Sequence, residues 1–162
     1  MGSLTLVAIK PLSVHCIATE GFVTDDMIVV RIKRRTAGVT TQSLQFGPFK
    51  LNNGQDASLL GAPELALLAD SDPKIEAADE LQIELTDIDC PTNDCWLDTN
   101  DSLGTVTKAA VAIAAEVGPG LAVGSSEFIF SKGTAHYTVH FQAETLFKAL
   151  KIPPPCAPPR PP

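Results

Sequence analysis

The chain has 162 residues, 44% of them apolar, which is enough for one domain with a hydrophobic core. Its 12 basic and 19 acidic residues give a net charge of −7, which argues against nucleic acid as a partner because phosphate binding needs a basic face. No apolar run approaches the roughly 20 residues of a membrane-spanning helix. We also expect no signal peptide, because no basic segment is followed by a long apolar core.

Short strand-like segments separated by turn residues fill the first half of the chain. Residues 4–9 are apolar, and alternating apolar residues over 14–18 and 28–32 predict strands with one buried face. Residues 45–51 predict another strand, and the Asn52-Asn53-Gly54 sequence after it predicts a hairpin turn.

A basic cluster lies at the end of the strand predicted over 28–32. We interpret it as a solvated strand end in preference to a binding patch. Its members are Arg31, Lys33, Arg34 and Arg35.

The second half of the chain continues the strand pattern. Residues 81–85 alternate apolar and polar, and the turn at 131–134 predicts a hairpin between strands 127–130 and 136–141. Tyr137, Val139 and Phe141 are expected on one face of the last strand, with His136, Thr138 and His140 on the other.

Helical signals are few. The alanine-rich segment 105–117 predicts a short helix that ends at Gly118-Pro119-Gly120, and residues 63–69 fit one helical turn. Strands at this spacing favour an all-β fold, an antiparallel β-sandwich of about eight strands over residues 1–151. Residues 152–162 are proline-rich and predict an extended polyproline arm. We expect that arm to engage neighbouring subunits.

The most distinctive feature of the sequence is an acidic cluster after the strand 81–85. Asp87 and Asp89 lie two residues apart, so their side chains point the same way at the strand end. Further oxygen ligands follow closely in the sequence: Asp94, Asp98, Asn100 and Asp101. Carboxylates gathered in this way repel one another unless a hard cation lies among them, and calcium takes six to eight oxygen ligands. The alternative is a solvated acidic loop.

The sequence from Leu81 to Asp89 resembles the Leu-x-Ile-x-Val-x-Asp-x-Asp strand of C2 domains, and Asp101-Ser102-Leu103-Gly104 resembles the exit from their calcium loop. An earlier loop fits the same resemblance, because Glu20 and Asp26 have the expected spacing before a strand and Asp25 adds a ligand. The resemblance covers about residues 4–145 and is closer to bacterial C2-like sandwiches of unassigned function than to signalling modules. It implies a Ca²⁺ site formed by both loops.

The chain departs from the C2 pattern in the second loop, which is about six residues longer than usual. Cys90 and Cys95 lie in this insertion, where we expect them to form a local disulfide; the alternative is two free thiols in a reducing compartment. Lysine-rich strands of the kind that bind inositol lipids are absent. The sequon Asn100-Asp101-Ser102 falls inside the expected ion site, which argues against its glycosylation.

The sequence contains none of the common catalytic motifs. It has no Gly-x-Ser-x-Gly elbow and no phosphate-binding loop, and His136 and His140 lie about 13 Å apart along one strand, too far to share a metal. We therefore expect a non-enzymatic, calcium-binding protein that assembles with copies of itself as a structural subunit. The alternative is a calcium-dependent membrane or glycan binder that uses Trp96, and a small hydrolase ranks third. The sequence favours an extracellular location or a particle surface.

Overall fold

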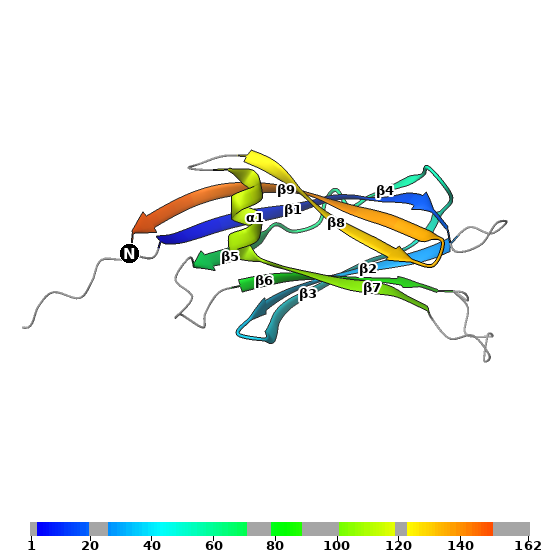
Figure 1. Cartoon of the computed structure of the whole chain (residues 1–162), viewed down its shortest axis with the longest axis horizontal. Helices are drawn as coiled ribbons and strands as arrows, with labels where there is room; N and C mark the ends of the chain where they lie inside the picture. The colour runs from blue at the N-terminus through cyan, green and yellow to red at the C-terminus, as the bar shows by residue number, and fades with distance from the viewer. Residues whose placement is uncertain (1–2, 20–25, 71–78, 89–100, 119–122, 151–162) are drawn as a thin grey trace, which may run out of the picture.

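The computed structural model describes residues 3–19, 26–70, 79–88, 101–118 and 123–150. These residues form nine strands and one helix, arranged as two facing antiparallel sheets (Figure 1). The predicted all-β sandwich is therefore confirmed. One sheet has the order β4 (Asp56–Ser58), β1 (Ser3–Ala18), β9 (Ala135–Leu150) and β8 (Val123–Lys132), with β5 (Leu65–Asp70) also beside β1. The other has the order β3 (Val39–Leu51), β2 (Asp26–Thr36), β6 (Asp79–Asp87) and β7 (Asp101–Ala109).

The core lies between the two sheets and follows the alternation that the sequence predicts. In β6, Leu81, Ile83 and Leu85 are fully buried, and the residues between them are half-buried. From the opposite sheet Phe141 packs edge-to-face against Phe128, with ring centroids 5.2 Å apart. Burial of this alternating face is the main force that holds the sheets together.

Strand β1 pairs with two short strands, β5 and β4, on the same side. It pairs with β9 over its whole length, with three shifts in register, but on its other side it pairs first with β5 and then with β4. Pro11 lies at this change of partner, next to a shift in the β1–β9 register. Because proline has no N–H to donate, it is tolerated where a strand has no continuous neighbour on that side.

Of the two helix predictions, the one over residues 63–69 is wrong and the one over 105–117 is correct only in part. Residues 63–69 do not form a helical turn, because Leu65, Leu67 and Ala69 are buried as the inner face of β5. The helix predicted over 105–117 is confined to α1 (Ala110–Val117), since residues 105–109 continue β7 along β6. Long-range pairing overrides local helix preference in both segments.

The turn at Asn52-Asn53-Gly54 does not close a hairpin. It carries the chain from β3 in one sheet to β4 in the other, where backbone bonds to Cys16 hold it: Gly54 N donates to Cys16 O at 2.8 Å, and Cys16 N donates to Gln55 O at 2.9 Å. The hairpin predicted at 131–134 is confirmed, with Lys132 opposite Ala135.

A buried carboxylate at the start of β6 ties the two sheets together. Asp79 is 1% exposed, and its Oδ2 accepts a 2.7 Å hydrogen bond from the backbone N of Leu68 in β5. The same oxygen lies 3.2 Å from Arg34 Nη2, and Thr36 Oγ1 donates to Asp79 Oδ1 at 2.5 Å. One side chain therefore contacts β5 of one sheet and β2 of the other.

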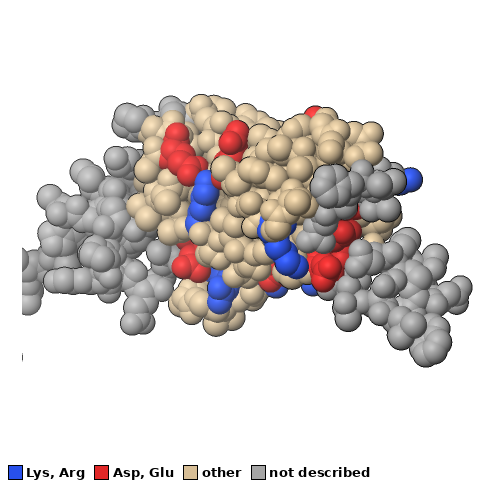
Figure 2. Space-filling model, turned by 45° about the vertical axis from the view of Figure 1, so that its right-hand side comes forward, with Lys and Arg blue, Asp and Glu red and all other residues tan. Residues whose placement is uncertain are grey.

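The basic cluster on β2 is engaged within the chain. Lys33 Nζ lies 2.7 Å from Glu84 Oε1, Arg34 pairs with Asp79, and Arg35 Nη2 donates to Gly38 O at 2.7 Å. Lys and Arg side chains are interspersed with acidic ones on the face shown in Figure 2. This supports the interpretation of the cluster as an ordinary strand surface.

Among the described residues no helix is both long and apolar enough to cross a bilayer.

Candidate cation site at the ends of β2, β6 and β7

Three of the nine predicted ligands lie within the described residues, and the structure brings their strands together. Asp26 begins β2, Asp87 ends β6 and Asp101 begins β7, all at the right-hand end of the sandwich in Figure 1. In the register of the sheet, Asp87 is the partner of both Ile28 and Asp101. The remaining predicted ligands and the candidate disulfide lie outside the described residues: Glu20, Asp25, Asp89, Asp94, Asp98, Asn100, Cys90 and Cys95.

The carboxylate of Asp87 fixes the end of β6 against the start of β2. Asp87 is 4% exposed, and its Oδ1 accepts a 2.9 Å hydrogen bond from the backbone N of Met27. Ile88 N donates in turn to Met27 O at 2.8 Å. A carboxylate has about four acceptor positions, so this backbone bond is compatible with a cation on the same group.

Asp101 lies directly across the strand pair from Asp87, and it is half-buried. Paired residues on neighbouring antiparallel strands point to the same face, with Cβ atoms about 5 Å apart. Two like charges in this position repel each other, so the pair is destabilising unless a proton or a cation offsets it. Among the described residues, Asp87 and Asp101 are the two predicted ligands that are direct strand partners.

Asp26 faces a different partner. Its Oδ2 accepts a short hydrogen bond from the hydroxyl of Tyr137, which is fully buried on β9. Burial, and after it the bond to Asp26, raises the pKa of Tyr137, so the phenol stays protonated and donates. This bond joins the two sheets, and a role for Asp26 as a cation ligand would have to coexist with it.

Tyr137 also lies beside Cys16, its partner in the β1–β9 register. Burial raises the pKa of the Cys16 thiol, a hydrogen bond with Tyr137 lowers it in part, and the charge of Asp26 raises it further. Cys16 is fully buried and free. It is therefore a small core residue, as the sequence predicts, and not a reactive thiol.

The described residues do not form a complete metal site by themselves. Nowhere among them do three His, Cys, Asp or Glu side chains come close enough together to hold a metal ion. Asp87 and Asp101 supply two neighbouring carboxylates, and the other oxygen ligands of the predicted site belong to loop residues outside the described ranges.

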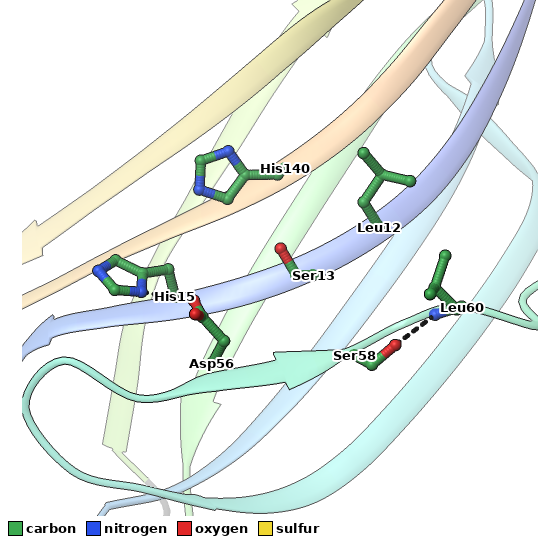
Figure 3. A pocket seen from close by; sticks show the side chains of 7 residues that line it. All are labelled: Leu12, Ser13, His15, Asp56, Ser58, Leu60 and His140. Carbon is green, nitrogen blue, oxygen red and sulfur yellow. Dashed lines mark hydrogen bonds and ion pairs between the residues drawn. The ribbon is translucent and has the colours of Figure 1, made fainter.

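A second group of polar residues, which sequence reasoning missed, lines a hollow of about 650 Å³ on the outer face of the other sheet (Figure 3). His15 Nδ1 lies 2.5 Å from Asp56 Oδ1, and His140 Nδ1 lies 3.4 Å from Glu127 Oε1. His15 and Asp56 are 41 residues apart, and they meet because β4 pairs with β1. No local signal in the sequence marks this pairing.

The hollow contains serine, histidine and aspartate, but their arrangement is not that of a nucleophilic triad. A triad needs the second histidine nitrogen within hydrogen-bond reach of the serine. In Figure 3 the far nitrogen of His15 points away from Ser13 and Ser58. Ser58 Oγ instead accepts a 3.2 Å bond from the backbone N of Leu60.

Comparisons with known proteins show a distant likeness of fold. No protein-family model matches the chain, and neither does any curated protein sequence. Among solved structures it is similar to human GIVD cytosolic phospholipase A2, in complex with methyl γ-linolenyl fluorophosphonate and terbium chloride, at 13% identity and a TM-score of 0.48 over 90% of this chain. The same enzyme in complex with methyl γ-linolenyl fluorophosphonate gives a TM-score of 0.49.

The chain spans 18% of the length of the phospholipase. It is also similar to a structure described as a C2 domain, at 11% identity and a TM-score of 0.39, over 87% of this chain and 97% of that one. The two sheets of the chain form an all-β sandwich, and the C2 domains that its sequence motifs resemble are among the structures with this distant likeness.

Proposed function

We propose that this protein is a non-enzymatic, calcium-binding module that assembles with copies of itself. The ion would be held at the ends of β2, β6 and β7. The observation that supports this is the placement of Asp87 directly opposite Asp101 at the end of the sheet. Two facing carboxylates favour a divalent cation, and a ligand set made of oxygen atoms favours calcium over zinc or copper.

The proposed ligands divide into two groups. Asp87 and Asp101 form the fixed pair on neighbouring strands, and Asp26 adds a third carboxylate at the start of β2. The remaining oxygens would come from the loops that leave these strand ends: Glu20, Asp25, Asp89, Asp94, Asp98 and Asn100. A Cys90–Cys95 disulfide would close a short ring within the second loop and limit its unfolded conformations.

Thermal unfolding with calcium and with a chelator tests the ion site. A ligand that binds the folded state at 100 times its Kd stabilises it by about 2.7 kcal/mol, or roughly 5–10 °C in Tm for a chain of this size. We expect Asp101→Asn to lose most of this shift. Asp56→Asn, which changes an exposed carboxylate on the other sheet, should keep it. Equal Tm values with calcium and with chelator would refute the ion site.

Assembly is tested separately by measuring the mass of the protein in solution. We expect a species larger than the monomer, and the proline-rich arm over 152–162 is one proposed contact with neighbours. A monomer that sediments with anionic vesicles only when calcium is present would instead support the membrane-binding alternative. The aromatic residue of that alternative, Trp96, lies outside the described residues.

A further inference from the structure

Strand β3 is an edge strand of the four-stranded sheet. Its 13 residues pair with β2 on one side, and in the strand order β3-β2-β6-β7 no strand of the described chain lies on the other side (Figure 1). Alternate backbone N–H and C=O groups of an edge strand point outward and offer hydrogen bonds to another strand.

Charged side chains bond to the backbone of two other edge strands, β5 and β8. On β5, the backbone N of Leu68 donates to Asp79, as described above. Between β7 and β8, Lys108 Nζ donates to the backbone O of Glu127 at 2.6 Å and lies 4.7 Å from the centre of the Phe128 ring. Charged side chains at an edge are a common device that prevents strands of other chains from pairing there.

Strand β3 has a single charged residue, Lys50, near its C-terminal end. From Val39 to Phe49 the strand carries no charged residue. Its core-facing side chains Leu44, Phe46 and Phe49 are half-buried, so they pack on the core and still expose apolar surface. The edge therefore combines outward backbone hydrogen-bonding groups with apolar surface, which is the combination that favours strand addition.

The most regular part of this edge is short and well defined. The β2–β3 register shifts on either side of residues 42–46 and is continuous within them, from Arg34 opposite Gln42 to Val30 opposite Phe46. Leu44 is the central residue of this stretch. Pro48, which has no N–H, lies just beyond it and limits pairing in that direction.

We propose that two copies of this protein pair through their β3 edges, antiparallel, with a twofold axis at Leu44. This inference rests on the self-assembly part of the proposed function and specifies its interface. The two four-stranded sheets would join into one of eight strands. Leu44 would face its own copy, and Ser43 would face Gln45 of the second copy on the outer face. An interface of this kind is self-complementary, as a twofold dimer requires.

A second copy fits this edge better than a sequence-specific peptide. Proteins that bind peptides by strand addition gain their specificity from side-chain pockets beside the edge. Two hollows in the described part of the chain lie on the other sheet, one around His15 and one around Lys10 and Glu144. Neither of these hollows lies beside β3, and the edge is uncharged from Val39 to Phe49, which favours pairing with an identical edge.

The charges nearest the edge do not oppose this pairing. In the outer row of the joined sheet, Arg31 would be followed by Gln45, then by Ser43 and Lys33 of the second copy. Three strand spacings separate the two cations by about 14 Å, which exceeds the screening length of about 8 Å at physiological salt. Lys33 is also paired with Glu84.

The first test is the mass of the full-length protein by sedimentation equilibrium, in wild type and in two variants. Ser43→Lys places a charge on the exposed face of the β3 edge, where the two lysines of a dimer would lie close together. Ser125→Lys is the matched control on the exposed face of β8. We expect Ser43→Lys to raise the dimer Kd about tenfold or more and Ser125→Lys to leave it unchanged.

The second test concerns register. Ser43→Cys and Gln45→Cys chains, mixed and oxidised, should form a disulfide between the two variants, because directly opposite residues lie within the 4.4–6.8 Å range of disulfide Cα distances. Each variant alone places its new cysteines on the diagonal, about 7–8 Å apart, and should cross-link much less. Equal cross-linking in all three samples would refute the register.

The outcomes separate this inference from the proposed function. A wild-type protein that remains monomeric at about 100 µM would refute both self-assembly and the β3 interface. A wild-type oligomer that Ser43→Lys leaves intact would refute the β3 interface and leave self-assembly standing. The calcium-dependent Tm shift is measured on the same proteins and tests the ion site independently.

Discussion

The buried carboxylate of Asp79 should contribute more to stability than any exposed carboxylate of this protein. Asp79→Ala removes three partners at once: the backbone N–H of Leu68, the hydroxyl of Thr36 and the guanidinium of Arg34. It also removes a side chain that contacts β5 and β2 together. We therefore expect both sheets to be weakened by a single substitution.

The size of the effect follows from these contacts. All three donors bond to one carboxylate; a hydrogen bond to a charged group contributes about 1.5–3 kcal/mol, and the cost of burying the charge offsets part of the sum. The Arg34 side chain is 33% exposed, so water compensates part of the lost ion pair. We expect a loss of about 3 kcal/mol in the free energy of unfolding, which corresponds to roughly 6–12 °C in Tm.

Urea unfolding followed by far-ultraviolet circular dichroism measures this loss, with chelator present so that calcium does not contribute. Asp79→Asn keeps the shape of the side chain and should cost less than Asp79→Ala. Asp56→Ala is the control, because Asp56 is 62% exposed and its contact with His15 is on the surface. If Asp79→Ala costs no more than Asp56→Ala, the proposed bridge between the sheets does not contribute to stability.

Three further predictions concern other parts of the fold. Tyr137→Phe removes the hydroxyl that donates to Asp26, so it should lower the unfolding free energy by about 1–3 kcal/mol in urea titrations; an unchanged midpoint would show that this buried bond is dispensable. Gly47→Ala should lower the unfolding free energy more than Gly54→Ala in the same assay. Both glycines have positive φ, but an added Cβ would lie 2.5 Å from a backbone carbonyl oxygen at Gly47 and would have no atom within 4 Å at Gly54; equal losses would contradict the clash. Burial disfavours the ionised form of Glu116, but hydrogen bonds from Lys108 and Ser126 outweigh burial and hold the pKa of Glu116 below its usual 4.5. The contribution of Glu116 to the free energy of unfolding is therefore present above pH 4.5 and declines as the pH falls through the pKa of the folded state. Glu116→Gln should flatten this part of the pH–stability curve, and an unaltered curve would refute the assignment.

Part of the candidate site was predictable because it lies at the ends of strands with clear alternation. The spacing of Asp87 after the alternating strand and the position of Asp101 before the next one placed both residues at one sheet end, and the structure makes them direct partners. The bond between Asp26 and Tyr137 was not predictable, because the residues are 111 positions apart and belong to different sheets. The role of Asp26, Asp87 and Asp101 as calcium ligands remains a prediction.

The sequence alone determined the all-β class, the inner face of β6 and β9, and the hairpin between β8 and β9. These features depend on two-residue periodicity and on turn residues, which act over a few positions. The tertiary structure alone decided that residues 65–70 and 105–109 are strands, that the Asn52-Asn53-Gly54 turn joins two sheets, and that Asp79 bridges them. It also decided which strand is left at an edge. Strand pairing depends on contacts between residues far apart in the chain, so it cannot be predicted from the local sequence.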